Sequence, residues 1–326
     1  MLYPLTFQPI FKERVWGGHN LERLYGKALP PGVPIGESWE ISDRPNDVSL
    51  IANGPMAGKD LHWLVEHHRD DLLGAAGLHG NRFPLLIKLL DARDKLSLQV
   101  HPPAHRAAEL GGEPKTEMWY IADAAPGAQL YVGLKRGVNR AVIEQKIQDG
   151  TVADCFHRFP VEAGDAMFLP SGRVHAIGAG LVIFEIQQNS DTTYRVFDWN
   201  RVGLDAKPRA LHMEESLASI DFSDFEPALI PRAFSGEGSI KLRPLVQDAH
   251  FSVEAIRTTA ATATTLKRRR MQIIACLKGA LRVADDQESV PLKPGGFCLV
   301  PACLERVQVT AEGEAVFLRV EANQLH

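Results

Sequence analysis

The sequence predicts a mainly β protein made of two small antiparallel double-sheet barrels with a small number of accessory helices. Most of the chain consists of short alternating runs of apolar and polar residues that Gly and Pro interrupt, as in strands joined by tight turns. Two stretches, VEAGDAMFLPSGRVHAI and PLKPGGFCLVPACLERVQV, share a glycine turn, an apolar strand and a proline at the same offset. Such a repeat indicates two similar β units, and closing each into a barrel removes exposed sheet edges.

Four helices are expected among these strands. The first is LHWLVEHHRDDLL, with Asp60 as its N-cap and Gly74 just beyond its end. The second, AHRAAEL, ends at a Gly-Gly pair, and the third, RAVIEQKIQD, has Asn139 as its N-cap. The fourth lies in or near MEESLASI. All four are short, so we expect them to be accessory helices of a β-dominated chain.

A metal site is predicted from four residues in the middle of the chain. Gln99 and His101 are two residues apart in LSLQVHPP, and alternate residues of a strand point to the same face. The Glu117 carboxylate and the His175 imidazole can complete a four-ligand set of nitrogen and oxygen atoms. Such a set suits zinc or a similar divalent ion.

The length of 326 residues allows about two domains. We expect residues 1–235 to form an N-terminal segment and a metal-binding barrel with helical insertions, and residues 236–326 to form a second β domain. In the repeat, Arg306 stands where the first unit has His175, and nothing in the second unit resembles the Gln-x-His pair. The second domain is therefore expected to hold no metal.

Composition excludes several classes of protein. Hydrophobic residues make up 45% and charged residues 23% of the chain, as in ordinary globular proteins, and a net charge of −4 gives no case for nucleic-acid binding. The one basic run, residues 267–270, is interpreted as a solvated loop or strand start. No apolar run approaches the ~20 residues of a membrane span, and no signal peptide is evident, so we expect a cytoplasmic protein. The four cysteines lack Cys-x-x-Cys spacing and are interpreted as reduced packing residues.

Several longer strings carry a resemblance to a known family. LSLQVHPP, KTEMWY, GDAMFLPSGRVHAIGAG, EIQQNSDTTYRVFDWNR and KPRALH, in this order, resemble the short bacterial type I mannose-6-phosphate isomerases (phosphomannose isomerases) of the cupin superfamily. The resemblance begins near residue 5 and is densest between Phe83 and His212. It implies two cupin-type (jelly-roll) β-barrels.

The resemblance also implies an activity and a cofactor. It implies an enzyme with one Zn²⁺ per chain, in the first barrel, that interconverts D-mannose 6-phosphate and D-fructose 6-phosphate through an enediol(ate). The expected partner is the sugar-phosphate substrate, with no nucleic acid and no membrane. A monomer and a weak dimer both stay open.

The family's residue roles are carried over by motif. Its metal ligands fall on the four residues named above. Its active-site lysine falls on Lys115, its arginine on Arg195, and its acidic position ten residues earlier on Glu185. Thr116 stands where the family often has Pro or Ser, a departure that leaves Lys115 in place.

Three further residues are expected to bind substrate. Lys88 and Ser97 match a basic and a hydroxyl position upstream of the Gln-x-His pair, although LLIKLLDARD also suits a strand with one exposed lysine. Trp39, in the resembling motif Gly-Glu-Ser-Trp-Glu, either walls the sugar cleft or is a buried structural tryptophan.

The chemistry itself requires a base, an electrophile and a phosphate anchor. Glu185 is the candidate base, and its alternative is a carboxylate that only pairs with Arg195. Lys115 shares a strand face with Glu117, so its ammonium can lie near the metal. Arg195 would clamp the phosphate or stabilise the enediolate.

Two other functional classes compete with the isomerase. His101, Glu117 and His175 alone would form the two-histidine, one-carboxylate set of an iron oxygenase, although Gln99 as a fourth ligand argues against it. A non-catalytic sugar-binding cupin would be expected to have lost the metal set, which this chain keeps. The physiological metal, the choice between phosphorylated and free mannose, and the residue that moves the proton stay open.

Overall fold

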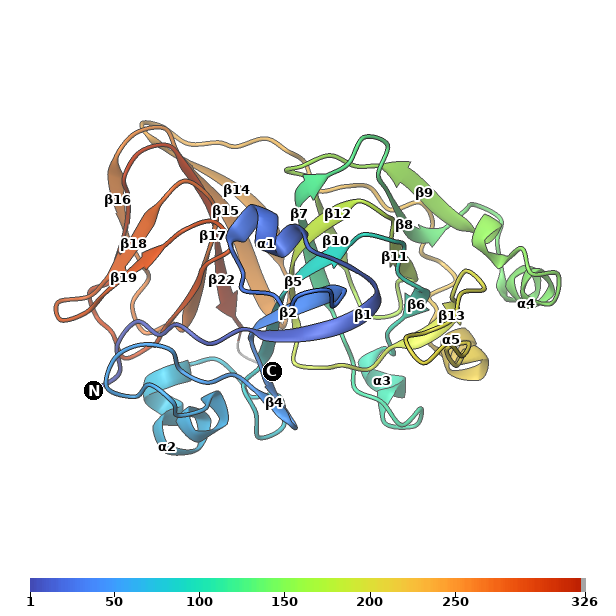
Figure 1. Cartoon of the computed structure of the whole chain (residues 1–326), viewed down its shortest axis with the longest axis horizontal. Coiled ribbons are helices and arrows are strands. Elements are labelled where there is room, and N and C mark those ends of the chain that lie inside the picture. The colour runs from blue at the N-terminus through green and yellow to red at the C-terminus, as the bar shows by residue number, and fades with distance from the viewer. Residues whose placement is uncertain (324–326) are drawn as a thin grey trace.

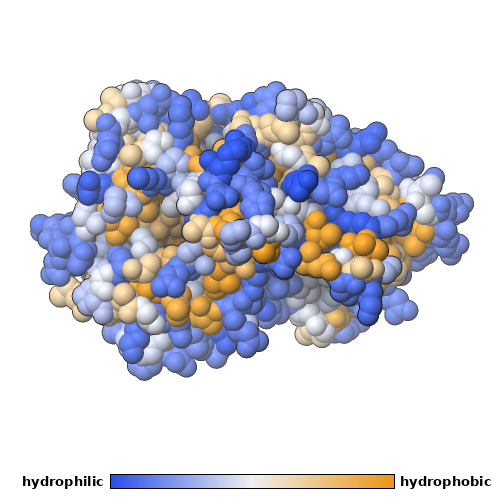
Figure 2. Space-filling view, viewed as in Figure 1, coloured by the Kyte–Doolittle hydropathy of each residue, from blue (hydrophilic) through white to orange (hydrophobic). Residues whose placement is uncertain are grey.

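The computed structural model describes residues 1–323 and is dominated by antiparallel strands. In Figure 1 the strands of the N-terminal unit lie on the right, and those of the C-terminal unit, orange to red, lie on the left. On the face that Figure 2 shows, hydrophilic residues form most of the periphery of the molecule, and apolar residues form separate patches. Each unit consists of two sheets, so the mainly β prediction is confirmed.

The N-terminal unit has a six-stranded sheet and a five-stranded sheet. The larger sheet, in spatial order, contains β1 (Ile10–Gly18), β2 (Ile35–Ile41), β5 (Leu85–Ala92), β12 (Leu181–Gln188), β7 (Glu117–Ala124) and β10 (Ala166–Leu169). The smaller sheet contains β13 (Tyr194–Phe197), β6 (Leu98–Val100), β11 (His175–Ile177), β8 (Gln129–Leu134) and β9 (Phe156–Pro160). A separate two-stranded ribbon joins β3 (Asp43–Arg44) to β4 (Asp47–Val48).

The C-terminal unit repeats this arrangement. Its larger sheet contains β14 (Ile240–Gln247), β15 (Phe251–Thr258), β22 (Ala315–Ala322), β17 (Gln272–Lys278) and β20 (Phe297–Val300). Its smaller sheet contains β16 (Thr262–Thr265), β21 (Gln308–Ala311), β18 (Leu281–Ala284) and β19 (Ser289–Leu292). These orders match β2-β5-β12-β7-β10 and β6-β11-β8-β9 strand for strand, which confirms the two similar β units that the repeat predicts.

The helices begin and end largely as the capping residues indicate. The described helices are α1 (Asn20–Tyr25), α2 (Leu61–Leu73), α3 (Ala104–Ala107), α4 (Arg140–Gln148), α5 (Met213–Ser219) and the 3-10 helix η1 (Val152–Cys155). Asp60 accepts a hydrogen bond from Trp63 N at 2.7 Å, and Asn139 accepts one from Val142 N at 3.0 Å, so both N-caps are confirmed. The prediction for α3 was too long, because the chain turns after Ala107, whose carbonyl accepts from Gly112 N at 2.8 Å.

The four cysteines are free, and three of them are buried. This agrees with their interpretation as packing residues. Over residues 1–323 no helix combines the length and the apolar character that a membrane crossing requires.

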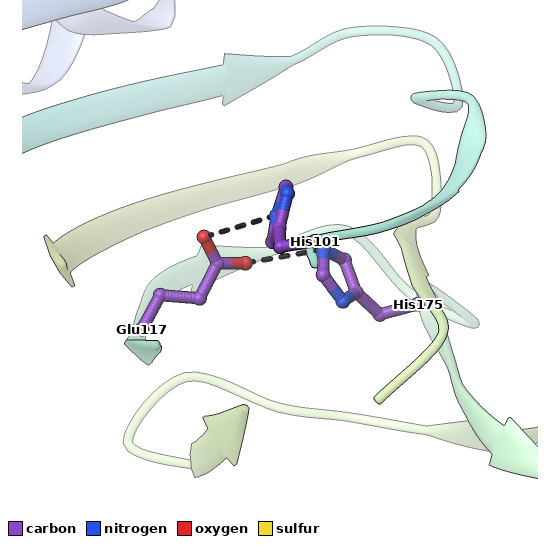
Figure 3. A group of neighbouring side chains, drawn as sticks. All are labelled: His101, Glu117 and His175. Carbon is purple, nitrogen blue, oxygen red and sulfur yellow. Dashed lines mark ion pairs between the residues drawn. The ribbon is translucent and has the colours of Figure 1, made fainter. Parts of the chain in front are cut away.

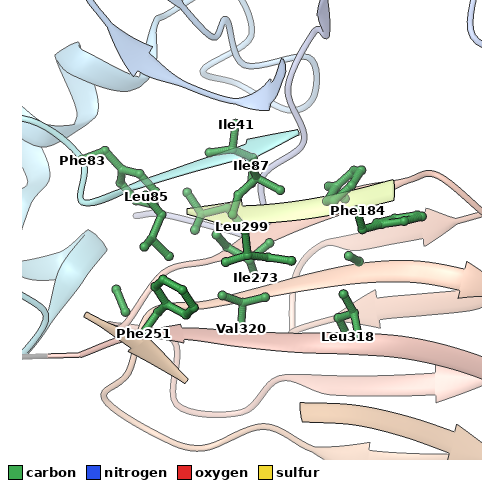
Figure 4. Packing of buried hydrophobic residues seen from close by; sticks show 14 of the residues in the cluster. Ile41, Phe83, Leu85, Ile87, Phe184, Phe251, Ile273, Leu299, Leu318 and Val320 are labelled. Atoms are coloured by element: carbon green, nitrogen blue, oxygen red, sulfur yellow. The ribbon is translucent and has the colours of Figure 1, made fainter. Parts of the chain in front are cut away.

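The two units share one hydrophobic core. Their larger sheets pack face to face, so that Leu85 and Ile87 of β5 lie against the side chains of Ile273 and Val320 from β17 and β22 (Figure 4). A shared apolar interface of this kind favours a fixed relation between the units. The predicted boundary at residue 235 lies in the connection between β13 and β14 and stays a prediction.

The N-terminal segment reaches across to the second unit. Leu5 N donates to Leu299 O and Leu299 N donates to Leu5 O, both at 2.8 Å. Leu5 is completely buried in the shared core. The first residues of the chain therefore cover the β20 edge of the C-terminal sheet, and an edge with paired backbone groups is protected from other strands.

Replacing Ile273 with alanine is expected to lower the free energy of unfolding by about 2–5 kcal/mol, because it leaves a cavity in a fully packed core. Ile273 has no exposed surface in the shared core. Denaturant midpoints of the variant and the wild type measure this difference. Leu211 is exposed, so Leu211→Ala should change stability by less than about 0.5 kcal/mol, and equal losses in both variants would contradict a shared core.

Candidate active site

Three ligating side chains meet between the two sheets of the N-terminal unit (Figure 3). His101 follows β6, Glu117 begins β7 and His175 begins β11. Glu117 Oε2 lies 3.5 Å from His101 Nε2, and Glu117 Oε1 lies 3.1 Å from His175 Nε2. All three residues are at most 2% exposed. The strands thus bring together three of the four residues predicted as ligands, from positions far apart in the sequence.

Hydrogen bonds fix the tautomer of both imidazoles. His101 Nδ1 lies 2.8 Å from Thr192 O, and His175 Nδ1 lies 2.9 Å from Arg173 O. A carbonyl oxygen can only accept, so each Nδ1 carries the proton and each Nε2 presents a lone pair to the Glu117 carboxylate. Hydrogen bonds that orient ligand imidazoles in this way are typical of metal sites.

The buried atoms between these groups fit a divalent cation. Among the described residues, His101 Nε2 and both Glu117 carboxylate oxygens have no hydrogen-bond partner. Buried acceptors that face one another are unfavourable unless a positive charge lies between them. Two imidazole nitrogens and a carboxylate are a suitable set for zinc or a similar ion.

The protonation states also suit metal binding. Burial and the nearby Lys115 lower the pKa of His101 to about 3, and burial lowers the pKa of His175. Burial alone would raise the pKa of Glu117, but His101 and Lys115 hold it below its usual range. At neutral pH the site therefore presents two neutral imidazoles and one carboxylate, as metal ligation requires.

The metal-free protein is expected to lose stability as the pH falls from about 6.5 towards 3. An unfolded histidine binds its proton near pH 6.5, whereas the pKa of folded His101 is about 3. Between these values the unfolded chain binds more protons, so the free energy of unfolding decreases as the pH falls. Denaturation of the chelated protein at pH 7 and pH 5 should show a smaller loss for His101→Gln than for the wild type. His105 is exposed, so His105→Gln should behave as the wild type; a full loss in His101→Gln would contradict the assignment.

Gln99 lies beside the cluster but presents its amide nitrogen to it. Gln99 Nε2 is 3.4 Å from His175 Nε2, and Gln99 Oε1 accepts from Ser97 Oγ at 3.1 Å. Rotating the amide by half a turn would exchange the two atoms, and the Ser97 hydroxyl could then accept instead of donate. Gln99 also lies opposite His175 on β11 and Arg195 on β13. Its role as a fourth ligand stays a prediction.

A cavity of about 540 Å³ opens next to the cluster. Six of the predicted site residues line it: Lys88, Ser97, Gln99, Lys115, Glu185 and Arg195. Lys115 Nζ lies 3.7 Å from Glu117 Oε2, which agrees with their shared strand face. The cavity therefore joins the metal cluster to most of the residues that the sequence assigned to catalysis and binding.

A buried network of charges forms one wall of the cavity. Lys88 Nζ lies 3.3 Å from Glu185 Oε2 and 3.6 Å from Glu37 Oε2, and Trp119 Nε1 donates to Glu185 Oε1 at 2.8 Å. Lys88 is only 4% exposed, so its alternative as an exposed strand lysine was wrong. Glu185 pairs with Lys88 and not with Arg195, which corrects the expected alternative for that carboxylate.

The two carboxylates beside Lys88 differ in protonation behaviour. Burial raises the pKa of Glu185, with Lys88 opposing the shift and Glu117 adding to it. Burial would also raise the pKa of Glu37, but Lys88 and Arg14 lower it to about 2. A raised pKa makes a carboxylate a stronger base, and a strongly lowered pKa makes it a weaker one.

Trp39 lies behind the cavity wall. It is 2% exposed, its Nε1 donates to Glu37 Oε2 at 2.6 Å, and Lys88 Nζ lies 5.2 Å from its ring centre. Its indole group thus orients two charged residues that lie on the same face of the sheet. The burial of Trp39 favours the structural role, and its contribution to the wall of the sugar cleft stays a prediction.

Arg195 enters the cavity from the smaller sheet. Its Nη1 donates to Ala210 O at 2.9 Å, and its Nε has no partner among the residues that the structure describes. Arg195 lies directly opposite Gln99 on the neighbouring strand, where facing side chains are about 5 Å apart at Cβ. Arg195 therefore starts from a position beside Gln99 and brings a guanidinium with a free donor into the cavity lining.

No role was assigned from the sequence to seven other polar residues that line the cavity: Glu13, Arg14, Glu37, Asp191, Thr193, Arg209 and His212. Glu37 stands two residues before Trp39 in the motif that drew attention to the tryptophan, so strand alternation would have placed both on one face. Arg209 and His212 lie in the string KPRALH, whose residues received no role. Arg14 lies in β1 and has no motif to mark it.

Comparison with known proteins identifies the family. Residues 5–127 match the family described as phosphomannose isomerase type I, catalytic domain, and residues 241–320 match the mannose-6-phosphate isomerase cupin domain. The second match agrees with the cupin-type fold of the C-terminal unit.

Full-length relatives extend the likeness to the whole chain. The chain is 35% identical to the mannose-6-phosphate isomerase ManA of Bacillus subtilis (96% of this chain, 98% of the relative) and 34% identical to a mannose-6-phosphate isomerase of Streptococcus mutans (97% and 98%). A crystal structure of the mannose 6-phosphate isomerase from Bacillus subtilis covers 98% of this chain and 99% of its own, with 30% identity and a TM-score of 0.88. A zinc-bound mannose 6-phosphate isomerase, 18% identical over 98% of this chain and 99% of its own, shares the fold with a TM-score of 0.76. By sequence and by fold, the chain belongs to the type I phosphomannose isomerase family.

Proposed function

We propose that this chain interconverts D-mannose 6-phosphate and D-fructose 6-phosphate at the cavity of the N-terminal unit, with one Zn²⁺ held by His101, Glu117, His175 and Gln99. The observation that carries the proposal is a buried cluster of unpaired metal-ligating atoms that adjoins a cavity lined by five cations and four carboxylates. The names of the full-length relatives support the substrate. The nitrogen and oxygen donors, and the zinc bound to a protein of the same fold, support the metal.

When bound, the metal would act as a Lewis acid and polarise the oxygens on C1 and C2 of the open sugar. The protein must then move a proton between those carbons. Glu185 is the base in this proposal, because it is buried, faces the cavity and has a raised pKa. In the forward direction its carboxylate removes the C2 proton to give the enediolate, and the resulting carboxylic acid returns that proton to C1 while the hydroxyl proton of O2 passes to O1, which yields the ketose.

Lys88 and Ser97 take supporting roles in this proposal. Lys88 already faces two carboxylates at 3.3 and 3.6 Å, which leaves it poorly placed to bind a phosphate as well. It holds Glu185 in position and balances its charge. The Ser97 hydroxyl contacts the Gln99 side chain at 3.1 Å; once the amide rotates to turn its oxygen towards the metal, this hydroxyl can accept from the amide nitrogen and so orient Gln99.

Arg195 and Lys115 are proposed to act on the oxygen atoms of the substrate. Lys115 lies beside Glu117, so its ammonium can donate to the sugar hydroxyls nearest the metal. Arg195 has an unpaired donor in the cavity and can stabilise negative charge on the enediolate or the phosphate. The proposed location is the cytoplasm, which the four free thiols support.

The function is tested by turnover under anaerobic conditions. Purified protein should convert mannose 6-phosphate to fructose 6-phosphate, chelation should abolish the activity, and zinc should restore it. Free mannose should be a much poorer substrate, because it lacks the anion that the cavity cations attract. A strict oxygen requirement without isomerisation would overturn the proposal and return the site to the oxygenase class.

Arg195→Ala is expected to retain the metal and to lower kcat/KM by about 10²–10³-fold, the usual loss for one donor to a developing anion. Initial rates with mannose 6-phosphate and metal analysis of the same sample measure both effects. Arg136 is exposed and pairs with Glu226 far from the cavity lining, so Arg136→Ala should leave the rate unchanged. Full activity in Arg195→Ala would remove this residue from the mechanism.

A further inference from the structure

The C-terminal unit contains a cavity of its own, of about 320 Å³. Strands β14, β15 and β22 line it, together with Lys267 and Arg270 from the basic run. These two side chains are each 51% exposed and point their charges at Glu321, at 2.7 and 3.8 Å. The run therefore forms part of a charged cavity rim, which refines its interpretation as a solvated loop.

Strand registers make the two cavities counterparts of one another. Glu117 begins β7 and lies opposite Gln187 on β12, whereas Gln272 begins β17 and lies opposite Glu321 on β22. Each of these first residues also lies opposite the last residue of the strand that precedes the proline of the repeat. Gln272 therefore occupies the position that the metal-binding carboxylate has in the first unit.

The charged pair beside that position is reversed. In the first unit Glu185 on β12 lies opposite Lys88 on β5, and in the second unit Arg319 on β22 lies opposite Glu254 on β15. Arg319 and Glu254 form a direct ion pair. A guanidinium thus stands where the proposed base stands in the active site, so the second cavity can bind but cannot repeat the same proton transfer.

Two buried polar atoms in this part of the unit have no partner among residues 1–323: one belongs to Arg319, which lines the cavity, and the other to Gln272, which lies opposite the lining residue Glu321. Gln272 is 1% exposed, and its Nε2 donates to Lys267 O at 2.8 Å, which leaves its Oε1 as an unpaired acceptor. Arg319 Nε is an unpaired donor. Each unmade bond to a buried group costs about 1–3 kcal/mol, so a bound molecule that offers both donors and acceptors would be stabilised here.

The charges of the lining specify the class of that molecule. Three cations, Lys267, Arg270 and Arg319, outnumber two carboxylates, Glu254 and Glu321. The surplus positive charge favours an anion, and the amide of Gln247 and the hydroxyl of Ser252 in the lining favour one that carries hydroxyl groups. The volume lies in the range of small-molecule sites and is smaller than that of the active-site cavity. We propose that the second barrel binds a small hydroxylated anion, a sugar phosphate or sugar acid, at this non-catalytic site.

Equilibrium dialysis of the full-length protein with labelled 6-phosphogluconate tests the proposal. This probe is neither an aldose nor a ketose, so isomerisation cannot alter it during the measurement. The wild type should bind two equivalents per chain, one in each cavity. The double variant Lys267→Ala, Arg270→Ala should bind the second equivalent at least tenfold more weakly, with kcat and KM for mannose 6-phosphate unchanged.

A matched control comes from the same basic run. Arg268 and Arg269 are exposed and do not line the cavity, so Arg268→Ala, Arg269→Ala removes equal charge and should keep both equivalents. Inorganic phosphate should displace the second equivalent less effectively than unlabelled 6-phosphogluconate does, because phosphate lacks the hydroxyl groups of the proposed ligand class. Binding by the Lys267, Arg270 variant that equals that of the wild type, in the number of equivalents and in affinity, would overturn the site. Because the readout is binding, failure of the proposed isomerase activity would be seen separately in the turnover assay.

Discussion

His101→Ala is expected to abolish tight metal binding and to lower kcat for mannose 6-phosphate by about 10³-fold or more. The substitution removes one of the two imidazoles that face Glu117. Lewis-acid stabilisation contributes several kcal/mol to such a transition state, and each 1.36 kcal/mol corresponds to about tenfold in rate. Metal analysis after dialysis and initial rates on the same preparation measure the two effects together.

The fold should survive this substitution, because the metal cluster lies outside the core shared by the two units. His105→Ala supplies the control, since His105 is exposed in α3 and should affect neither metal content nor rate. A His101→Ala protein that retained one equivalent of metal and normal turnover would show that the His-Glu-His cluster is not the catalytic metal site.

Glu185→Gln is expected to lower kcat by about 10²–10⁴-fold, the usual contribution of a positioned general base, and to leave the metal in place. The amide keeps the size of the side chain and can still accept from Trp119 Nε1, but it cannot take up a proton. The loss should appear in kcat more than in KM, because the base acts in the transition state.

Glu37→Gln discriminates between the two carboxylates that face Lys88. Glu37 has a pKa of about 2 because Lys88 and Arg14 overcome the effect of burial, so it stays ionised and is a weak base. Its replacement should change KM or stability and leave most of kcat. If Glu37→Gln loses the turnover and Glu185→Gln keeps it, the base is Glu37 and the assignment made above is wrong.

The metal cluster could be predicted because each of its residues stands in a short motif that can be recognised within one strand. Gln99 and His101 are two residues apart, so strand alternation places both side chains on one face. Glu117 and His175 each stand at the start of a strand, within a motif that can be recognised in the sequence. The strand repeat likewise predicts two units, since glycine turns and prolines recur at the same spacing in two stretches of the sequence. Alternation does not, however, decide which atom of the Gln99 amide faces the cluster, which depends on the Ser97 hydroxyl.

The charged wall of the cavity could not be predicted because it depends on which strands are neighbours in the sheet and on the register in which they pair. Glu37, Lys88 and Glu185 come from β2, β5 and β12, which are adjacent in the sheet but far apart in the sequence. Only the register of pairing shows that Lys88 has two carboxylates as neighbours, and hence that it is not an exposed lysine. The short helix α1 was missed for a different reason, since it spans six residues and His19 gives it no side-chain cap.

The pairing of Leu5 with Leu299 has a consequence for how the protein is made. A ribosome synthesises the first residues early, but their strand partner emerges only near the end of the 326-residue chain. Contacts between such distant positions form slowly, because a long loop must close first. The apolar face of β5 and β12 has to wait for the same late segments, β17 and β22, to cover it. We therefore expect the nascent chain to expose this sheet throughout most of translation, when a chaperone that binds apolar strands would be most useful.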